Sequence, residues 1–264
     1  MYKLLFLLSL FSISTISCFA QLEKIDSDRP DQSTSPVTMP KKWIQFEAGF
    51  SKQASRNPYT GQERFKDLEF KHPTLLTRYG LTKSIELRLI TDYATSRGKE
   101  DNIIINRQHG IESVQFGVKA NFLKEKGLRP KTSLIAHYDF GRLRTLNKDT
   151  LDGANIFLAM QHTVTQKISV CYNLGLGWGR FGEPPAYIYS LSPGFDISDE
   201  WSCYVELFGS IWKDENPENS IDFGIVYFPT SNIKLDISSG FGISRYAPDW
   251  YIAIGGSFRF KTGK

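Results

Sequence analysis

The sequence predicts an all-β fold: a transmembrane, antiparallel up-and-down β-barrel of about 12 strands with an N-terminal periplasmic or lumenal arm. Three observations lead to this prediction. Aromatic residues make up 14% of the chain, beside 21 glycines and a mean hydropathy of −0.30, which favours strands over apolar helices. Many segments place apolar residues at every second position, the period of a half-buried strand. Tight turns alternate with longer polar connections, as in a barrel whose two rims face different compartments.

Residues 1–20 have the pattern of a secretory signal peptide, which is removed on export. Lys3 precedes an apolar run from Leu4 to Ile16, and Ala20 provides a small residue at the cleavage site. The run is too short for a comfortable membrane span. The alternative is a lipoprotein anchored through Cys18, although Ile16-Ser17 before it matches the required motif poorly. We therefore expect an exported chain that begins at Gln21.

Residues 21–42 form a polar, proline-bearing arm without apolar periodicity. The stretch from Asp28 to Ser33 could enter the barrel as a lumenal plug, with Arg29 paired to a wall carboxylate such as Glu86 or Glu206. The plug candidates are Asp28, Arg29 and Asp31. The alternative is a loose periplasmic tail in which Asp and Pro residues form turns.

Residues 43–264 are expected to form the barrel. Strands should begin near Trp43, Leu68, Ser84, Gly110, Lys131, Gly153, Lys167, Ala186, Glu200, Ser220, Asn232 and Asp249. The even-numbered connections are mostly tight, as at residues 81–84, whereas the first two odd-numbered ones are expected as polar loops at Ser51–Lys66 and Ser96–Gln108. A soluble β-sandwich is the alternative fold, but its Greek-key crossings would not sort loop lengths in this way.

Alternation within each strand separates a lipid face from a lumenal face. In the segment after Ser113, for example, Phe116 and Val118 alternate with Lys119. A Lys or Arg at the lipid midplane costs about 2–4 kcal/mol, so the charged side must line the lumen. The candidates for the lumen and the solute pathway are Glu47, Arg78, Glu86, Arg88, Asp92, Lys119, His137, Asp139, Glu206, Asp222, Asp236 and Arg259. Acids outnumber bases among the lumenal charges, which favours cations or neutral solutes; the alternative is a salt-bridged filling that conducts nothing.

Two further patterns fit a membrane barrel. The aromatic residues Trp43, Tyr79, Trp178, Trp201, Trp212 and Trp250 fall near strand ends, where aromatic girdles meet the two membrane interfaces. Cys171 has the lumenal parity and Cys203 the lipid parity, on strands separated by one other strand. We therefore expect two free thiols.

No constellation of residues indicates catalysis, a cofactor or a metal site. His137 and Asp139 share a strand face, but two ligands do not make a metal site. Neither His109 nor His162 has a nucleophilic serine and a polar orienting group beside it. The net charge of +4 is spread along the chain, which argues against a nucleic-acid surface. The sequence therefore predicts a protein that is not an enzyme and has no cofactor, no metal and no nucleic-acid partner.

Several stretches resemble a known family. They are Asp28–Ser33, Ser35-Pro36, Pro40–Glu47 and Leu75–Arg88. Together they are similar to the outer-membrane barrels labelled "putative meta-pathway of phenol degradation", often called transporters. The resemblance is sharpest over residues 26–90. It implies a barrel channel in the bacterial outer membrane, and its label does not establish phenol as a solute.

The C-terminus resembles a signal for the barrel-assembly machinery. Gly255, Phe258 and Phe260 supply the pattern, which we place on the lipid-facing parity, although four residues follow the terminal aromatic. The expected partners are thus this machinery, outer-membrane lipid and an unknown small solute.

The sequence favours a channel or transporter of the Gram-negative outer membrane. It would pass small solutes, aromatic or other hydrophobic ones among them, through a polar lumen of mixed charge. One alternative is a non-conducting scaffold or adhesin that binds partners through its external loops. Another is an outer-membrane enzyme.

Overall fold

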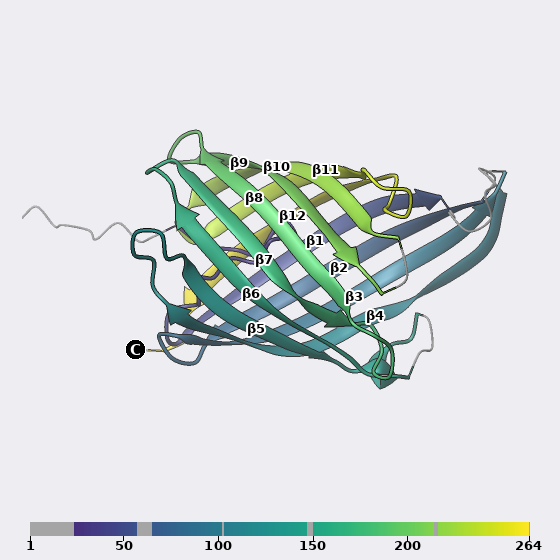
Figure 1. Cartoon of the computed structure of the whole chain (residues 1–264), viewed down its shortest axis with the longest axis horizontal. Coiled ribbons are helices and arrows are strands. Elements are labelled where there is room, and N and C mark those ends of the chain that lie inside the picture. Colours follow the sequence, from purple (N-terminus) through teal and green to yellow (C-terminus); the bar gives the residue numbers. More distant parts are fainter. Residues whose placement is uncertain (1–23, 57–64, 102, 147–149, 214–215, 264) are drawn as a thin grey trace, which may run out of the picture.

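Twelve antiparallel strands form a closed barrel in the part of the chain that the structure describes, which comprises residues 24–56, 65–101, 103–146, 150–213 and 216–263 (Figure 1). The structure is a computed structural model. Each strand pairs with the next one along the chain, and β12 pairs with β1 to close the sheet. This is the predicted up-and-down topology. The predicted signal peptide, residues 1–20, lies outside the described residues.

The strands differ in length around the barrel. They are β1 (Trp43–Arg56), β2 (Phe65–Gly80), β3 (Ile85–Glu100), β4 (Ile103–Leu123), β5 (Lys131–Asp139), β6 (Gly153–Thr163), β7 (Ile168–Trp178), β8 (Ala186–Asp196), β9 (Trp201–Ile211), β10 (Glu218–Thr230), β11 (Ile233–Gly242) and β12 (Trp250–Lys261). A single turn of 3₁₀ helix, η1 (Gly141–Leu143), follows β5. No helix in the described residues is long and apolar enough to cross a membrane.

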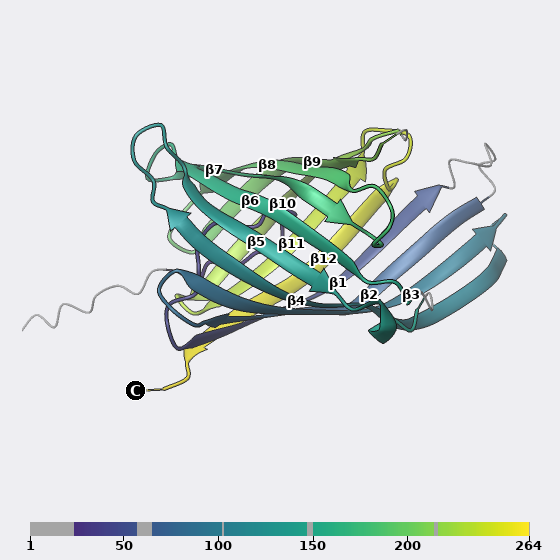
Figure 2. The ribbon, with the colours of Figure 1, turned by 60° about the horizontal axis from the view of Figure 1, so that its bottom comes forward.

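Strands β1–β4 extend well beyond the rest of the barrel, at the end away from the C-terminus (Figure 2). This corrects the two predicted polar loops. β1 continues to Arg56 and β2 begins at Phe65, while β3 and β4 occupy nearly all of the stretch predicted as the Ser96–Gln108 loop, with His109 inside β4. The prediction failed because residues 51–56 and 96–100 are mainly polar at successive positions, while residues 103–105 are apolar at successive positions, so these stretches show no alternation. Most other strands begin close to their predicted residues.

The two faces of the barrel wall are those that the alternation predicted. Phe116 on β4 and Phe223 on β10 are exposed to the outside, while Lys119 and Asp222 on the same strands are completely buried inside. Apolar side chains therefore cover the outer surface, and charged side chains fill the interior. This arrangement suits a barrel surrounded by lipid.

Aromatic residues mark the two rims. Trp43, Tyr79 and Trp201 lie at the rim of the tight turns, where β1 and β9 begin and β2 ends. Trp178 and Trp250 lie at the opposite rim, with Trp212 directly after β9. The predicted position of these residues near strand ends is confirmed. Cys171 and Cys203 are also both free, as predicted.

Candidate functional site

The N-terminal arm lies inside the barrel. Between Asp26 and Met39 it forms hydrogen bonds with inward-facing side chains from strands all around the wall. Ser33 and Met39 are each only 2% exposed. Such burial of polar backbone requires partners, and the charged and amide side chains of the wall provide them.

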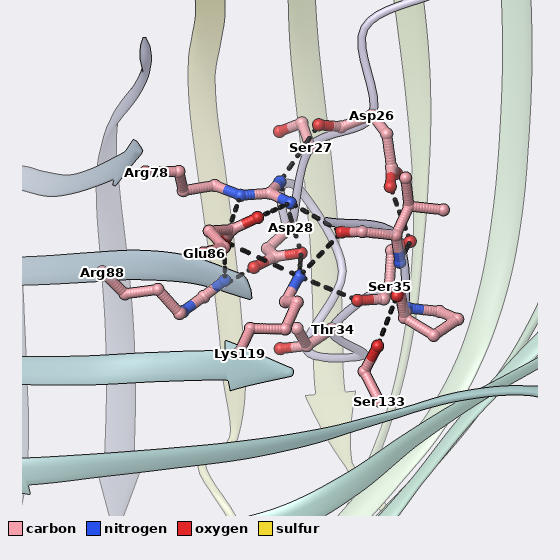
Figure 3. Close-up of polar contacts among 12 residues, drawn as sticks. Asp26, Ser27, Asp28, Thr34, Ser35, Arg78, Glu86, Arg88, Lys119 and Ser133 are labelled. Carbon is pink, nitrogen blue, oxygen red and sulfur yellow. Dashed lines mark hydrogen bonds and ion pairs between the residues drawn. The ribbon is translucent and has the colours of Figure 1, made fainter. Parts of the chain in front are cut away.

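The first anchor of the arm is Asp28, which meets three cations of the wall (Figure 3). Its Oδ2 lies 2.6 Å from Arg88 Nη2, and its Oδ1 lies 3.3 Å from Lys119 Nζ and 3.6 Å from Arg78 Nη1. The backbone N–H of Asp28 donates to Glu47 Oε2 at 2.9 Å. One arm residue thus contacts strands β1, β2, β3 and β4.

Glu86 completes this cluster from β3. Its carboxylate accepts a bidentate pair of hydrogen bonds from Arg78, from Nε at 2.8 Å and from Nη2 at 3.0 Å. Its Oε1 also accepts from Arg88 at 2.9 Å, and its Oε2 accepts from the backbone N–H of Met39. Arg78 in turn reaches Glu47 at 3.0 Å. The cluster therefore balances three carboxylates, one of which belongs to the arm, against three cations.

The same cations hold the backbone of the arm. Lys119 Nζ donates to the carbonyl of Ser35 at 2.8 Å, and Arg78 Nη2 donates to that of Val37 at 3.0 Å. The hydroxyl of Ser133 on β5 donates to the carbonyl of Pro36 at 2.5 Å. Lys119 and Arg78 thus each satisfy both a carboxylate and an arm carbonyl, which is the condition for burying charge without a large penalty.

The second anchor is Arg29, which lies against β1, β12 and β11, the strands on the other flank of β1 from those that bind Asp28. Its Nη2 lies 2.8 Å from Asp236 Oδ1 on β11. The sequence correctly suggested a wall carboxylate, but Glu86 and Glu206, the two named examples, have other partners. The guanidinium rests on Gly49 and Gly255, where an added Cβ would lie 2.0 and 2.4 Å from its nitrogens.

This placement corrects the prediction for the C-terminal pattern. Gly255 pairs with Gly49 and Asp236 and faces the lumen, because the intervening residues put it on the opposite parity from the two phenylalanines. Phe258 and Phe260 face outward as predicted and are 49% and 47% exposed.

The third part of the arm binds strands β7, β8 and β9. Glu206 accepts from the backbone N–H of Gln32 at 2.6 Å and from the Ser33 hydroxyl at 2.5 Å. The side chain of Asn173 bonds both the N–H and the carbonyl of Thr34, at 2.6 and 3.0 Å. An amide side chain that pairs with one backbone unit in this way fixes the local path of the arm.

The two acidic residues of the arm sit in opposite electrostatic environments. Burial alone would raise the pKa of Asp28, but the charges of Arg78, Lys119 and Arg88 hold it well below the ordinary value. Burial raises the pKa of Asp31 to about 7, although Lys234 and a hydrogen bond from Ser192 oppose the shift. Asp28 is thus firmly ionised, while Asp31 titrates near neutral pH.

The remaining lumen candidates lie apart from this network or at its edge. His137 accepts from Arg88 Nε at 2.9 Å and also bonds Asn155, whereas Asp139 pairs with Arg144 at 2.7 Å. The two side chains therefore bind different partners and do not act together as the pair of metal ligands considered from the sequence. His137 is also buried, not solvated. The others are Asp92, inside β3; Asp222, bonded to Tyr204 and Tyr251; and Arg259, stacked on Trp43 at the tight-turn rim.

Several residues that bind the arm were not singled out from the sequence as candidates. They are Gln45, Ser133, Asn173, Ser190 and Ser192, all on the lumenal face and all uncharged. The alternation along their strands already placed these residues on the lumenal face, but the candidates were chosen mainly among charged residues. Lumenal position alone would have identified them.

Two cavities lie on opposite sides of the arm. One, of about 360 Å³, is bounded by Asp31 and Ser33 and opens toward the tight β6–β7 turn at Lys167. The other, of about 380 Å³, is bounded by Gln32 and by Phe157 and Phe208 of the wall, toward the opposite rim. Residues 31–33 thus stand between the two spaces. The described residues contain no group of three or more His, Cys, Asp or Glu side chains able to hold a metal.

A family model described as "Putative MetA-pathway of phenol degradation" matches residues 27–260. The chain belongs to this family. The match covers both the lumenal arm and nearly the whole barrel, so arm and wall are parts of one family unit. No curated protein sequence matches the chain significantly.

Solved structures show the same fold for this family member. An outer membrane channel from Pseudomonas putida F1 superposes with a TM-score of 0.68 at 11% identity, covering 90% of this chain and 100% of the other. The translocator domain of the autotransporter NalP from Neisseria meningitidis gives 0.53 at 9% identity, covering 84% and 90%. A deltaS2S3 mutant of TodX, a monoaromatic hydrocarbon channel, gives 0.51 at 9% identity, covering 86% and 93%.

Proposed function

We propose that the protein is an outer-membrane channel for small solutes that the N-terminal arm closes. The observation that carries this proposal is the ion cluster of Asp28 with Arg78, Arg88 and Lys119, which fastens the arm across the lumen. Without the arm, a barrel of 12 strands would enclose a space between the filled eight-stranded case and the open porins.

The two cavities support a route along strands β6–β9. The arm meets the opposite wall, β1–β4, through buried ion pairs, whereas residues 31–34 meet β7–β9 through hydrogen bonds in which the carboxylates of Asp31 and Glu206 are the charged groups. Displacement of residues 31–33 would join the two spaces. Because fewer buried charges would have to separate on this side, it is the side that should open.

The side chains along this route indicate the class of solute. Phe157, Ile188 and Phe208 line one cavity beside Asn155 and Asn173. Apolar walls with a few polar groups suit small, weakly polar molecules. TodX, which shares the barrel fold, is a channel for monoaromatic hydrocarbons. Small aromatic compounds are therefore the first solutes to test.

Single-channel conductance in planar bilayers tests the proposal. The mature protein is compared with a version that lacks residues 21–42, after the mobility of unheated samples on gels confirms that both are folded. Conductance that rises on deletion supports a channel closed by the arm. Absence of current from both folded proteins would contradict it and favour a non-conducting scaffold. Swelling of liposomes in small aromatic solutes then ranks candidate solutes.

A further inference from the structure

A groove with an apolar floor and a basic rim lies on the projecting sheet β1–β4. Its volume is about 590 Å³. The floor consists of Phe50, Leu68 and Phe70, and the rim carries Lys52, Arg97 and Arg107. The charged and apolar side chains come from four strands and meet only in the folded sheet.

The groove lies on the outer surface of the barrel, not in the lumen. Phe46, Phe50 and Lys52 share one face of β1, and the ring of Phe46 stacks on the outward Phe258 at 5.2 Å. Phe50 is 53% exposed, whereas Glu47 on the other face is 1% exposed. Cross-strand partners point to the same side, so Phe70, the partner of Lys52, is outward as well.

The register places the groove beside a tryptophan of the outer rim. Trp250 pairs with Ala54, which pairs with Leu68; Leu68 pairs with Arg97, and Arg97 with Arg107. This row therefore runs from a rim tryptophan directly to two arginines. Lys52 also lies 5.7 Å from the ring of Trp250. Tryptophans of such rims lie at the depth of the lipid headgroups, so Lys52, which contacts Trp250, lies there too.

The positive charge of the groove is not balanced on its own face. The rows that hold Lys52, Arg97 and Lys99 contain no acidic residue between β1 and β4. Glu69 borders the groove, but by parity it belongs to the lumenal face and pairs with Lys71 there. Arg56, one row further out, is already paired with Asp249 and takes no part. Headgroup phosphates can supply the missing negative charge.

We propose that this groove binds an anionic, phosphate-bearing lipid of the outward-facing leaflet. A headgroup phosphate would bind Lys52, Arg97 and Arg107. The guanidinium groups of the two arginines can each donate two hydrogen bonds to phosphate oxygens, and the ammonium of Lys52 adds a third positive charge. An acyl chain would cover Phe50, Leu68 and Phe70. Charge complementarity and the apolar floor beside it favour this occupant, since a free phosphate would leave the floor exposed. The proposal is independent of whether the lumen conducts.

Native mass spectrometry of the mature protein in detergent tests this proposal, with lipid A as the probe because it carries both acyl chains and phosphates. Lipid A should remain bound, and the same lipid without its phosphates should bind more weakly. Equal binding of both lipids would overturn the proposal without any variant. Displacement of lipid A by millimolar inorganic phosphate would also overturn it, because the groove would then be a site for the free anion.

A triple variant, Lys52→Gln, Arg97→Gln and Arg107→Gln, identifies the site. Each cation near a lipid surface contributes about fivefold, so lipid A should bind about 100-fold more weakly to the triple variant. The matched control, Lys83→Gln, Lys126→Gln and Lys167→Gln, removes three exposed cations from the opposite rim and should bind normally. Gel mobility of unheated samples verifies that both are folded. Equal binding by the two folded variants would overturn the proposal.

Discussion

The carboxylate of Asp28 lies 2.6 Å from the guanidinium of Arg88, in an interior where both side chains are almost completely shielded from solvent. One residue belongs to the arm and the other to the wall, so the contact joins two parts of the chain that are not otherwise one element. Because a buried charge needs its partner, the position of the arm and the stability of the wall depend on each other.

Replacement of Asp28 by Asn should release the arm. The change leaves Arg78, Arg88 and Lys119 with two carboxylates, and breaking a buried pair costs about 3 kcal/mol, which corresponds to about 100-fold in the docking equilibrium. Single-channel recording should show a correspondingly higher open probability. Asp199→Asn, which changes an exposed residue of a tight turn, is the control and should behave as wild type. Unchanged gating in Asp28→Asn would mean that the arm does not close the channel.

Replacement of Gly255 by Val should dislodge Arg29 from the wall. A side chain there would occupy the space of the guanidinium, whose nitrogen lies 2.4 Å from the Cβ position. Cys171 can report the result, because its Sγ lies 3.5 Å from the carbonyl of Thr34 in the docked arm. In a Cys203→Ser background, a water-soluble maleimide should label Cys171 faster in Gly255→Val.

Gly177→Val is the matched control for that experiment. Gly177 also has the lumenal parity, but the nearest atom to its Cβ position is 3.8 Å away, so the valine should fit without displacing the arm. Equal labelling rates in the two variants would show that the contact of Arg29 with the wall does not hold the arm.

In the protein without residues 21–42, the charges of the wall should set the ion selectivity. The cluster then holds three cations, Lys119 among them, beside Glu47 and Glu86, whereas Asp236 loses its partner Arg29. Reversal potentials in a KCl gradient should therefore shift toward cation selectivity in Lys119→Gln and toward anion selectivity in Glu86→Gln. Equal reversal potentials in the two variants would mean that permeating ions do not pass this part of the wall.

The docked arm should weaken as the pH rises toward neutrality. Burial raises the pKa of Asp31 to about 7 from 3.8, so docking favours the protonated carboxyl. The contribution is complete below about pH 4 and falls as the pH rises to about 7, by at most about tenfold per pH unit. Labelling of Cys171 between pH 5 and pH 8 measures this trend when the rate at each pH is divided by the rate in the protein without residues 21–42, because the ratio removes the pH dependence of the thiol itself. Asp31→Asn should flatten it; an equally steep profile in that variant would assign the titration to Glu206 or Asp222 nearby.

Most of the barrel wall was predicted from the alternation of apolar and polar residues along each strand. Glu86, Arg88 and Lys119 could be assigned to the lumen because their neighbours along the strand are apolar and the cost of charge in lipid has a definite sign. The same test failed for residues 96–108, because residues 96–100 are mainly polar at successive positions and residues 103–105 are apolar at successive positions, so neither part alternates. Alternation of residues therefore predicts a strand only where one face must be apolar and the other polar.

The partners of the arm were beyond what the sequence could predict. Whether Arg29 meets Glu86, Glu206 or Asp236 depends on how far the arm reaches and on the tilt of the strands, neither of which is local. Asp28 could be named as a plug candidate from its position in the arm. Its three cationic partners become neighbours only once β2, β3 and β4 lie side by side.

The distribution of partners along the chain also bears on the order of assembly. Asp28 binds residues of β2, β3 and β4, all within the first half of the sequence, whereas Asp236, the partner of Arg29, lies 207 positions further on. Short loops close with less loss of entropy than long ones. We therefore expect the arm to bind the early strands while the sheet is still open. The pairing of β12 with β1 would then close a barrel in which the arm is already in place.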